Sequence, residues 1–205
     1  MIAIITGDVV HSRGLPTEQW LSHLKKGLEK FGNSPQDWEI YRGDSFQFRT
    51  APEDALYHAV LLKAWMKYFK EIDVRMSIGI GTQSFEGTTI TEGNGLAFER
   101  SGEGFDKLGK KNLSIHTPNE SLNAAFGVMC DLALLLMDKW SEKTAEVIYL
   151  KLKNPELNQK GIAMILDKKG QGNISETLKR GGFDEIYQFI NYYHQTMKRY
   201  VAATS

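Results

Sequence analysis

The chain has 205 residues, of which 41% are hydrophobic and 24% charged, and its 25 Lys and Arg balance its 25 Asp and Glu. This length supports one large domain or two small ones around a well-buried core, and the composition is that of an ordinary soluble globular protein. The zero net charge excludes a strong overall attraction to nucleic acid or membrane, and the single cysteine, Cys130, excludes an intramolecular disulfide and a cysteine-built metal cluster.

Two stretches in the N-terminal part place a carboxylate beside a strand. The stretch Ile2–Arg13 opens with an apolar run that ends in Gly7-Asp8, which predicts a buried strand that ends near Asp8. Alternation predicts two further strands, Trp38–Ile40 and Ser45–Arg49, with Asp44 in the turn between them. Two carboxylates on adjacent strands can share Mg²⁺, which completes its shell with water or phosphate. The alternative is that both are ordinary turn residues beside glycine.

The remainder of the N-terminal part alternates helices and strands. Apolar residues at helical spacing predict helices after Pro16 and after Pro52, and a third over Leu96–Leu108. Strands are predicted at Val74–Gly81, whose glycines indicate the close approach of another backbone, and at Leu113–His116. The order β-α-β-β-α-β-α-β is typical of an α+β ferredoxin-like fold with an antiparallel hairpin in its middle. We therefore expect a first domain over residues 1–118.

Residues 119–140 are expected to connect this domain to the rest of the chain. Leu122–Trp140 is predicted to be a long helix with apolar residues on nearly every side, either buried between the two parts or lying in a dimer interface. The longest apolar stretch, Ala124–Met137, contains Asp131 and is too short to span a bilayer. Because no secretory signal is visible either, we expect a cytoplasmic protein that does not enter the membrane.

Residues 141–205 are predicted to form an all-α domain. Helices are expected from Ser141 to Asn154, over Asn158–Leu166, over Ile174–Arg180 and over Phe183–Val201, with a polar turn at 167–172. This is the arrangement of a helix-turn-helix, in which the third helix lies in the major groove of DNA. The polar residues of that helix are candidates for base or phosphate contacts: Asn173, Ser175, Glu176, Lys179 and Arg180.

The charge of this part is low for a DNA-binding domain. Its 10 Lys and Arg against 7 Asp and Glu give a net charge of +3, whereas residues 1–140 hold 15 against 18 and carry −3. A protein that neutralises several phosphates usually carries more positive charge. A structural role for the three helices, as a packing or dimer module, is therefore the alternative.

Three segments, IITGDVVHSR, YRGDSFQ and VRMSIGIGT, resemble in this order the SatD family of bacterial proteins, and the resemblance covers nearly the whole chain. The first domain of that family is similar to the palm of class III nucleotide cyclases and GGDEF proteins. The resemblance implies a Mg²⁺ or Mn²⁺ site at Asp8 and Asp44. It also implies a nucleotide or phosphate site, for which the candidates are Ser12, Arg42, Ser45 and Arg100. The C-terminal part matches the helix-turn-helix of related sequences at Gln159-Lys160 and at Leu178-Lys179-Arg180, among other positions.

The chain departs from these patterns at positions that matter for catalysis. Tyr41 stands where cyclases commonly place a purine-selecting Lys, Ala97 replaces an Asn, and Arg100 falls next to the position of the cyclase Arg. Ser45 stands where GGDEF proteins place a Glu, and Gly161 replaces the usual acidic residue of the helix-turn-helix. Losing that Glu removes one ligand of a two-metal site. The resemblance therefore implies a degenerate palm.

Three functions remain open from the sequence. The first is a transcriptional regulator, whose palm senses a metal or a nucleotide-like ligand and whose helix-turn-helix binds DNA. The second is a Mg²⁺- or Mn²⁺-dependent nucleotide-processing enzyme of cyclase type, with Asp8 and Asp44 as metal ligands. The third is a non-catalytic interaction module that forms a homodimer through Leu122–Trp140. Of these, the regulator is the leading expectation.

Overall fold

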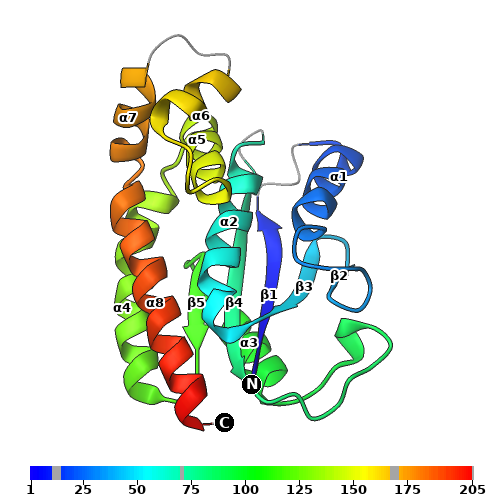
Figure 1. Cartoon of the computed structure of the whole chain (residues 1–205). Coiled ribbons are helices and arrows are strands. Elements are labelled where there is room, and N and C mark those ends of the chain that lie inside the picture. The colour runs from blue at the N-terminus through cyan, green and yellow to red at the C-terminus, as the bar shows by residue number, and fades with distance from the viewer. Residues whose placement is uncertain (11–14, 70–71, 167–170, 205) are drawn as a thin grey trace.

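The fold is α+β and is organised around a mixed sheet of five strands (Figure 1). The computed structural model describes residues 1–10, 15–69, 72–166 and 171–204. The strands are β1 (Ile2–Val10), β2 (Trp38–Tyr41), β3 (Ser45–Thr50), β4 (Asp73–Gly81) and β5 (Leu113–His116). They lie in the order β2-β3-β1-β4-β5, and every neighbouring pair is antiparallel except β4 and β5.

The helices follow the predicted order along the chain. In the N-terminal part they are α1 (Thr17–Leu28), the short 3₁₀ turn η2 (Pro52–Asp54), α2 (Ala55–Lys67), the 3₁₀ turn η3 (Ile90–Glu92) and α3 (Leu96–Asp106). The C-terminal part contributes α4 (Glu120–Met137), α5 (Glu142–Lys153), α6 (Gln159–Ile165), α7 (Gln171–Arg180) and α8 (Phe183–Thr204).

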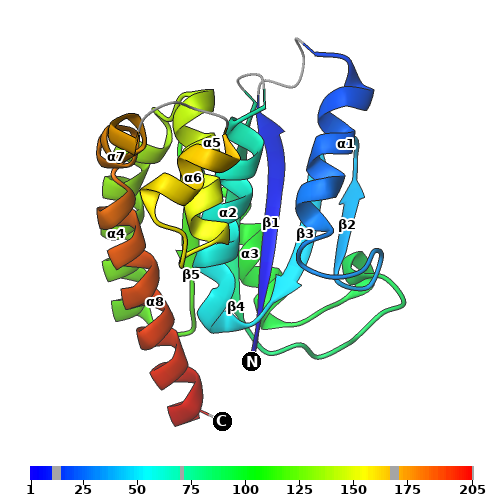
Figure 2. The ribbon, with the colours of Figure 1, turned by 45° about the horizontal axis from the view of Figure 1, so that its top comes forward.

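The two faces of the sheet are covered differently (Figure 2). Helices α1 and α2 cover one face, on which apolar strand residues such as Ile5, Phe48 and Ile78 are fully buried. Helix α3 covers the opposite face and comes so close that a side chain on Gly79 would overlap the backbone of Ala97 and Ser101. The glycines of β4 thus have the role predicted for them, because only residues without a Cβ admit the backbone of α3 here.

The C-terminal helices extend the core that the sheet begins. Helix α4 packs against β5 and α8, and α5 packs against α2. One continuous cluster of buried side chains runs from Ala3 in β1 to Met197 in α8. The buried Tyr193 of α8 donates a hydrogen bond from its hydroxyl to the carbonyl of Pro52, 2.8 Å away. Hydrophobic burial and this bond therefore fasten the last helix to the region that precedes α2.

Several element boundaries differ from the predictions. β1 continues two residues beyond Asp8, because Val9 and Val10 still pair with β4. Helix α4 begins at Glu120, where Asn119 caps it by accepting a hydrogen bond from the backbone N–H of Leu122. Helix α7 begins at Gln171, inside the predicted polar turn.

Helix α4 has the length and composition of a membrane-spanning helix, and 28% of the relevant 18-residue window is buried inside the protein. It is the one helix of the described ranges that passes this test. A single helix of this kind is weak evidence for a membrane span, since the core helices of soluble proteins pass the same test.

Candidate functional site

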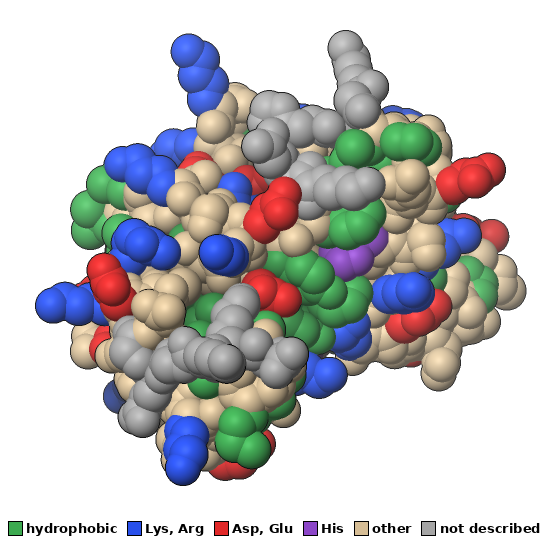
Figure 3. Space-filling view, turned by 90° about the horizontal axis from the view of Figure 1, so that it is seen from above, with side chains coloured by type: hydrophobic (Ala, Val, Ile, Leu, Met, Phe, Trp, Pro, Cys, Tyr) green, Lys and Arg blue, Asp and Glu red, His purple; other side chains and the backbone are tan. Residues whose placement is uncertain are grey.

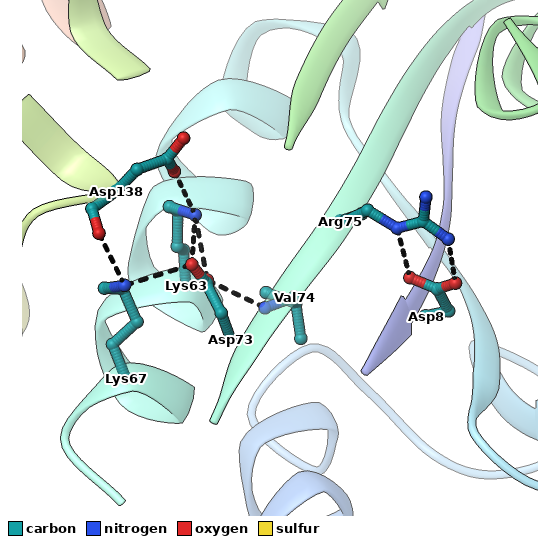
Figure 4. Close-up of polar contacts among 7 residues, drawn as sticks. All are labelled: Asp8, Lys63, Lys67, Asp73, Val74, Arg75 and Asp138. Carbon is teal, nitrogen blue, oxygen red and sulfur yellow. Dashed lines mark hydrogen bonds and ion pairs between the residues drawn. The ribbon is translucent and has the colours of Figure 1, made fainter. Parts of the chain in front are cut away.

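Asp8 lies near the C-terminal end of β1, between Ser45 of β3 and Arg75 of β4 in the hydrogen-bonded ladder. Arg75 forms a bidentate ion pair with Asp8: the guanidinium Nε donates to Oδ1 at 3.0 Å, and Nη2 donates to Oδ2 (Figure 4). Asp8 and Arg75 are both partly buried. This paired geometry is the strong form of an Arg–carboxylate contact, because two parallel hydrogen bonds fix both groups.

The turn between β2 and β3 brings Asp44 to the same end of the sheet. The carbonyl of Asp44 accepts a hydrogen bond of 3.2 Å from the backbone N–H of Val9. The pKa of Arg75 is raised, chiefly by the hydrogen bond to Asp8, with further contributions from the charges of Asp8 and Asp44. Two carboxylates and one guanidinium therefore form the electrostatic centre of this region, which we call the β1-end site.

Two further elements border the β1-end site. Arg42 in the turn is exposed and has a φ of 50°, a left-handed conformation that is uncommon for a long side chain. The guanidinium carbon of Arg75 lies 5.6 Å from the ring centroid of Phe105, at the end of α3. Burial raises the pKa of the Tyr41 hydroxyl, the charge of Arg42 lowers it, and the charge of Asp106 raises it. The β2–β3 turn and the end of α3 thus both approach this end of β1.

The structure brings together four of the six residues predicted for the metal and phosphate sites. Asp8, Asp44, Arg42 and Ser45 all lie at this end of the sheet, and Ser12 lies outside the described residues. Arg100 is elsewhere, because its Nη1 donates to the carbonyl of Ile80 at 2.9 Å. Ile80 pairs with Ala3, five residues along β1 from Asp8, which corresponds to roughly 17 Å.

The β1-end site does not by itself supply a metal centre. Both carboxylate oxygens of Asp8 already accept a hydrogen bond from Arg75, so a cation at Asp8 would have to use the remaining lone pairs, beside a positively charged guanidinium. Among the described residues there is no group of three His, Cys, Asp or Glu side chains placed to hold a metal ion. A divalent cation at Asp8 and Asp44 would therefore need to complete its shell with water or ligand phosphate.

A row of polar residues crosses the whole sheet on the face that α3 partly covers. The strand register aligns Glu39, Gln47, Thr6, Ser77 and Ser114, one from each of β2, β3, β1, β4 and β5. Thr6 Oγ1 accepts from Gln47 Nε2 at 3.0 Å and forms a 2.9 Å hydrogen bond with Ser101 of α3. The face that carries the β1-end site is thus polar in its middle, whereas the α1–α2 face is apolar.

A second charged cluster lies at the start of β4, two residues from Arg75 (Figure 4). The Lys63 side chain is 0% exposed, and its Nζ donates to both oxygens of Asp73 at 2.8 and 3.0 Å and contacts Asp138 Oδ1 at 2.9 Å. Lys67 donates to Asp73 at 3.0 Å and to the backbone carbonyl of Asp138 at 3.1 Å. These two lysines and two aspartates, here called the Lys63 cluster, join α2, β4 and the end of α4.

Helix α7 is the second candidate site. Its apolar residues Ile174 and Leu178 are buried. Every predicted DNA-contacting residue of this helix is exposed, namely Asn173, Ser175, Glu176, Lys179 and Arg180. Seen from above, several Lys and Arg side chains lie on the side of the molecule that carries α4, α5 and α7, with Asp and Glu among them, and further Lys and Arg lie on the opposite side (Figure 3).

A shallow cavity of about 390 Å³ lies between α5 and α7. Val147 and Ile174 are its apolar lining residues, and its charged ones include Lys143 and Arg180. Glu176 also lines it, so both signs of charge are present. The cavity extends the polar surface of α7 onto α5.

Two charged residues that the structure makes prominent were not predicted as site residues. Arg75 is the one cation of strand β4, whose other residues apart from Asp73 are apolar or small, and that isolation was the available signal. Its pairing with Asp8 depends on the register between β1 and β4, which alternation does not specify. Lys63 stands among the apolar residues of its helix in the sequence, and its partners come from segments 10 and 75 residues away.

Comparisons with protein-family models, with curated proteins and with solved structures find no match for this chain.

Proposed function

We propose that the protein is a regulatory DNA-binding protein of the bacterial cytoplasm, in which α5, α6 and α7 form a helix-turn-helix and α7 is the recognition helix. The observation that carries the proposal is the separation of the two sides of α7. Its apolar residues Ile174 and Leu178 are buried in the core, whereas all five polar candidates are exposed. A recognition helix needs this arrangement, because one side must be fixed to the protein while the other enters the major groove.

The exposed residues suit both kinds of contact with DNA. Lys179 and Arg180 can neutralise phosphates or bind guanine, and Asn173 can pair with adenine. Glu176 opposes the phosphate charge, but it can accept a hydrogen bond from the exocyclic amine of cytosine. Lys143 on the adjacent α5 adds another cation beside the cavity. The chemistry supports a helix that positions itself on phosphates and reads a few bases.

Fluorescence anisotropy with labelled duplex DNA of mixed sequence at 50 mM salt tests the proposal. The double variant Lys179→Ala/Arg180→Ala should bind at least tenfold more weakly than the wild type. The matched control is Lys198→Ala/Arg199→Ala, which removes the same dipeptide from the exposed surface of α8 and should leave affinity unchanged. Equal losses in both variants would show that the contact is not made by α7.

We propose a second function for the β1-end site, the binding of a phosphate-bearing, nucleotide-like ligand together with Mg²⁺ or Mn²⁺. The element order β1-α1-β2-β3-α2-β4 and the strand order β2-β3-β1-β4 support a ferredoxin-like palm. The position of Asp8 and Asp44 around Arg75 supports a site that combines negative carboxylates, for a cation, with a positive guanidinium, for a phosphate. Arg75 uses two of its nitrogens on Asp8, so Nη1 remains able to donate to a phosphate.

A thermal-shift series with Mn²⁺ and a panel of nucleoside phosphates tests this second function. Ligand at ~100 times its dissociation constant adds about 2.7 kcal/mol to the free energy of unfolding and raises the melting temperature by several degrees. Asp44→Asn should abolish the shift, whereas Asp184→Asn on the surface of α8 should retain it. The same samples, assayed for nucleotide turnover, separate a sensor from an enzyme: product that is lost in Asp44→Asn would establish the enzyme alternative.

A further inference from the structure

The outer face of α4 carries more large exposed apolar side chains than any other helix in the described ranges. Val128, Leu132 and Leu135 are 62%, 61% and 60% exposed. The opposite side of the same helix is buried, with Phe126 and Met137 fully inside the core. Their spacing of four and three residues places the three exposed side chains in one line along the helix. Such a line, on a helix whose opposite side is part of the core, marks an interaction surface.

An apolar groove continues this surface toward α8. Its volume is about 340 Å³, and Met129, Leu132, Ala133 and Leu136 of α4 face Ile186 and Phe189 of α8 across it. Glu185 is the one charged residue in its lining. Because Leu132 belongs both to the exposed line and to the groove, the two form one continuous surface, here called the α4 face.

We propose that the α4 face is a dimer interface on which a second copy of this chain packs with its α4 antiparallel to the first. The charges at the two ends of the helix favour this partner. Glu120 is exposed at the first residue of α4, and Lys139 is exposed just after the last. Antiparallel packing brings Lys139 of one copy to the Glu120 end of the other, whereas parallel packing would place like charges together.

Side-chain size along α4 favours the same arrangement. The N-terminal half of the outer face is built from small residues such as Ser121, Ala124 and Ala125, and the C-terminal half carries Leu132 and Leu135. When Val128 of one copy faces Leu132 of the other, Leu135 falls opposite Ala125. Large side chains then meet small ones at both ends of the contact, as close packing requires. One surface is therefore complementary to itself, which is the condition for an isologous dimer.

The expected dimer is reversible. Helix α4 is about 27 Å long, and paired helices lie about 8–10 Å apart, so the strip of contact is small for an obligate dimer even with the groove added. Sedimentation velocity of the whole chain should therefore show a dimer that dissociates on dilution. Leu132→Glu should be monomeric at every concentration, while Met164→Glu on α6, where Met164 is 73% exposed, should dimerise like the wild type. A wild-type monomer at high concentration would overturn the proposal, and so would dimerisation of Leu132→Glu.

Cysteine cross-linking tests the orientation separately. A mixture of Ala125→Cys and Leu135→Cys chains should form a disulfide-linked dimer on oxidation, because these positions face each other in the antiparallel pair. Either variant alone should cross-link poorly, since its own cysteines lie far apart along the helix. Efficient cross-linking of each variant alone would contradict the antiparallel arrangement. The native Cys130 does not interfere, because it is buried and burial raises the pKa of its thiol to about 12.

Discussion

Charged residues in the core are stable because residues of opposite charge lie beside them, and Lys63 is the clearest case. An ammonium group withdrawn from water is costly unless its hydrogen bonds are replaced, and Lys63 replaces them with Asp73 and Asp138. The same arrangement fixes the end of α4 against α2, because Lys67 bonds to the backbone carbonyl of Asp138 at 3.1 Å. Lys63, although it lies in a largely apolar helix, thus helps to fix the position of the end of α4, from which the chain continues into α5.

Removing the Lys63 ammonium should destabilise the fold strongly. Lys63→Met keeps most of the side-chain volume but leaves Asp73 and Asp138 short of a partner, and the free energy of unfolding should fall by about 3 kcal/mol. Lys25→Met, at an exposed position of α1, should change it by less than about 0.5 kcal/mol. Urea denaturation measures both, and a Lys63 variant as stable as the control would show that the cluster contributes little.

Buried and half-buried histidines make stability depend on pH. Burial is the largest cause of a lowered pKa at His23, His58 and His116 in the folded protein. The unfolded chain protonates these residues near pH 6.5, whereas the folded chain resists protonation until lower pH. Their contribution is therefore fully present above pH 6.5 and is lost as the pH falls below it.

Urea denaturation between pH 7.5 and 5.0 should thus show stability falling with pH, and His58→Phe should give a shallower dependence whatever its stability at pH 7.5. NMR titration of the imidazole signals should place all three pKa values below 6.5. Values at or above 6.5 would contradict the burial argument.

At the scale of elements, the contact between β4 and α3 depends on residues without side chains. Gly79→Ala would push a methyl group into the backbone of α3 at Ala97 and Ser101, and backbone cannot move aside as a side chain can. Overpacking of this kind should cost about 1–3 kcal/mol or more. Gly102→Ala lies in α3 with no atom near the added methyl, and it should stabilise the helix by about 0.5–1 kcal/mol. Thermal unfolding of the pair would contradict this account if both changes had the same sign.

Much of this architecture was predictable from local patterns. Alternation identified the strands, and the glycines of β4 correctly indicated a close backbone contact. The predicted bounds of α5 also agreed, since Ser141 begins the helix by accepting a hydrogen bond from Thr144 N–H and the helix ends before Pro155. Local pattern is informative here because capping and turn chemistry act over three or four residues.

Contacts between distant segments were not predictable in the same way. The Asp8–Arg75 pair joins residues 67 positions apart, and only the strand register brings them together. Arg100 was expected at the phosphate site, but it lies at the other end of the sheet from Asp8. Its position depends on where α3 packs and not on its sequence spacing from other residues. The outer face of α4 could not be distinguished from its buried face, because apolar residues occupy both.

At the scale of the whole molecule, the positive charge lies where the proposed function needs it. The chain is neutral overall, yet residues 141–205 carry 10 Lys and Arg against 7 Asp and Glu. Five exposed cations belong to α5, α6 and α7, namely Lys143, Lys153, Lys160, Lys179 and Arg180. DNA binding by this surface should therefore be modest in affinity and strongly dependent on salt, because each neutralised phosphate releases bound counterions.

The salt dependence of duplex DNA binding by the whole protein tests the central claim most directly. Two to four phosphate contacts predict that log Kobs falls linearly with log[salt], with a slope of about −2 to −4. Lys179→Ala should make that slope shallower by about 1, while Lys198→Ala on α8 should leave it unchanged. Absence of binding at 50 mM salt, or a slope that Lys179→Ala does not alter, would contradict the assignment of α7 as a recognition helix.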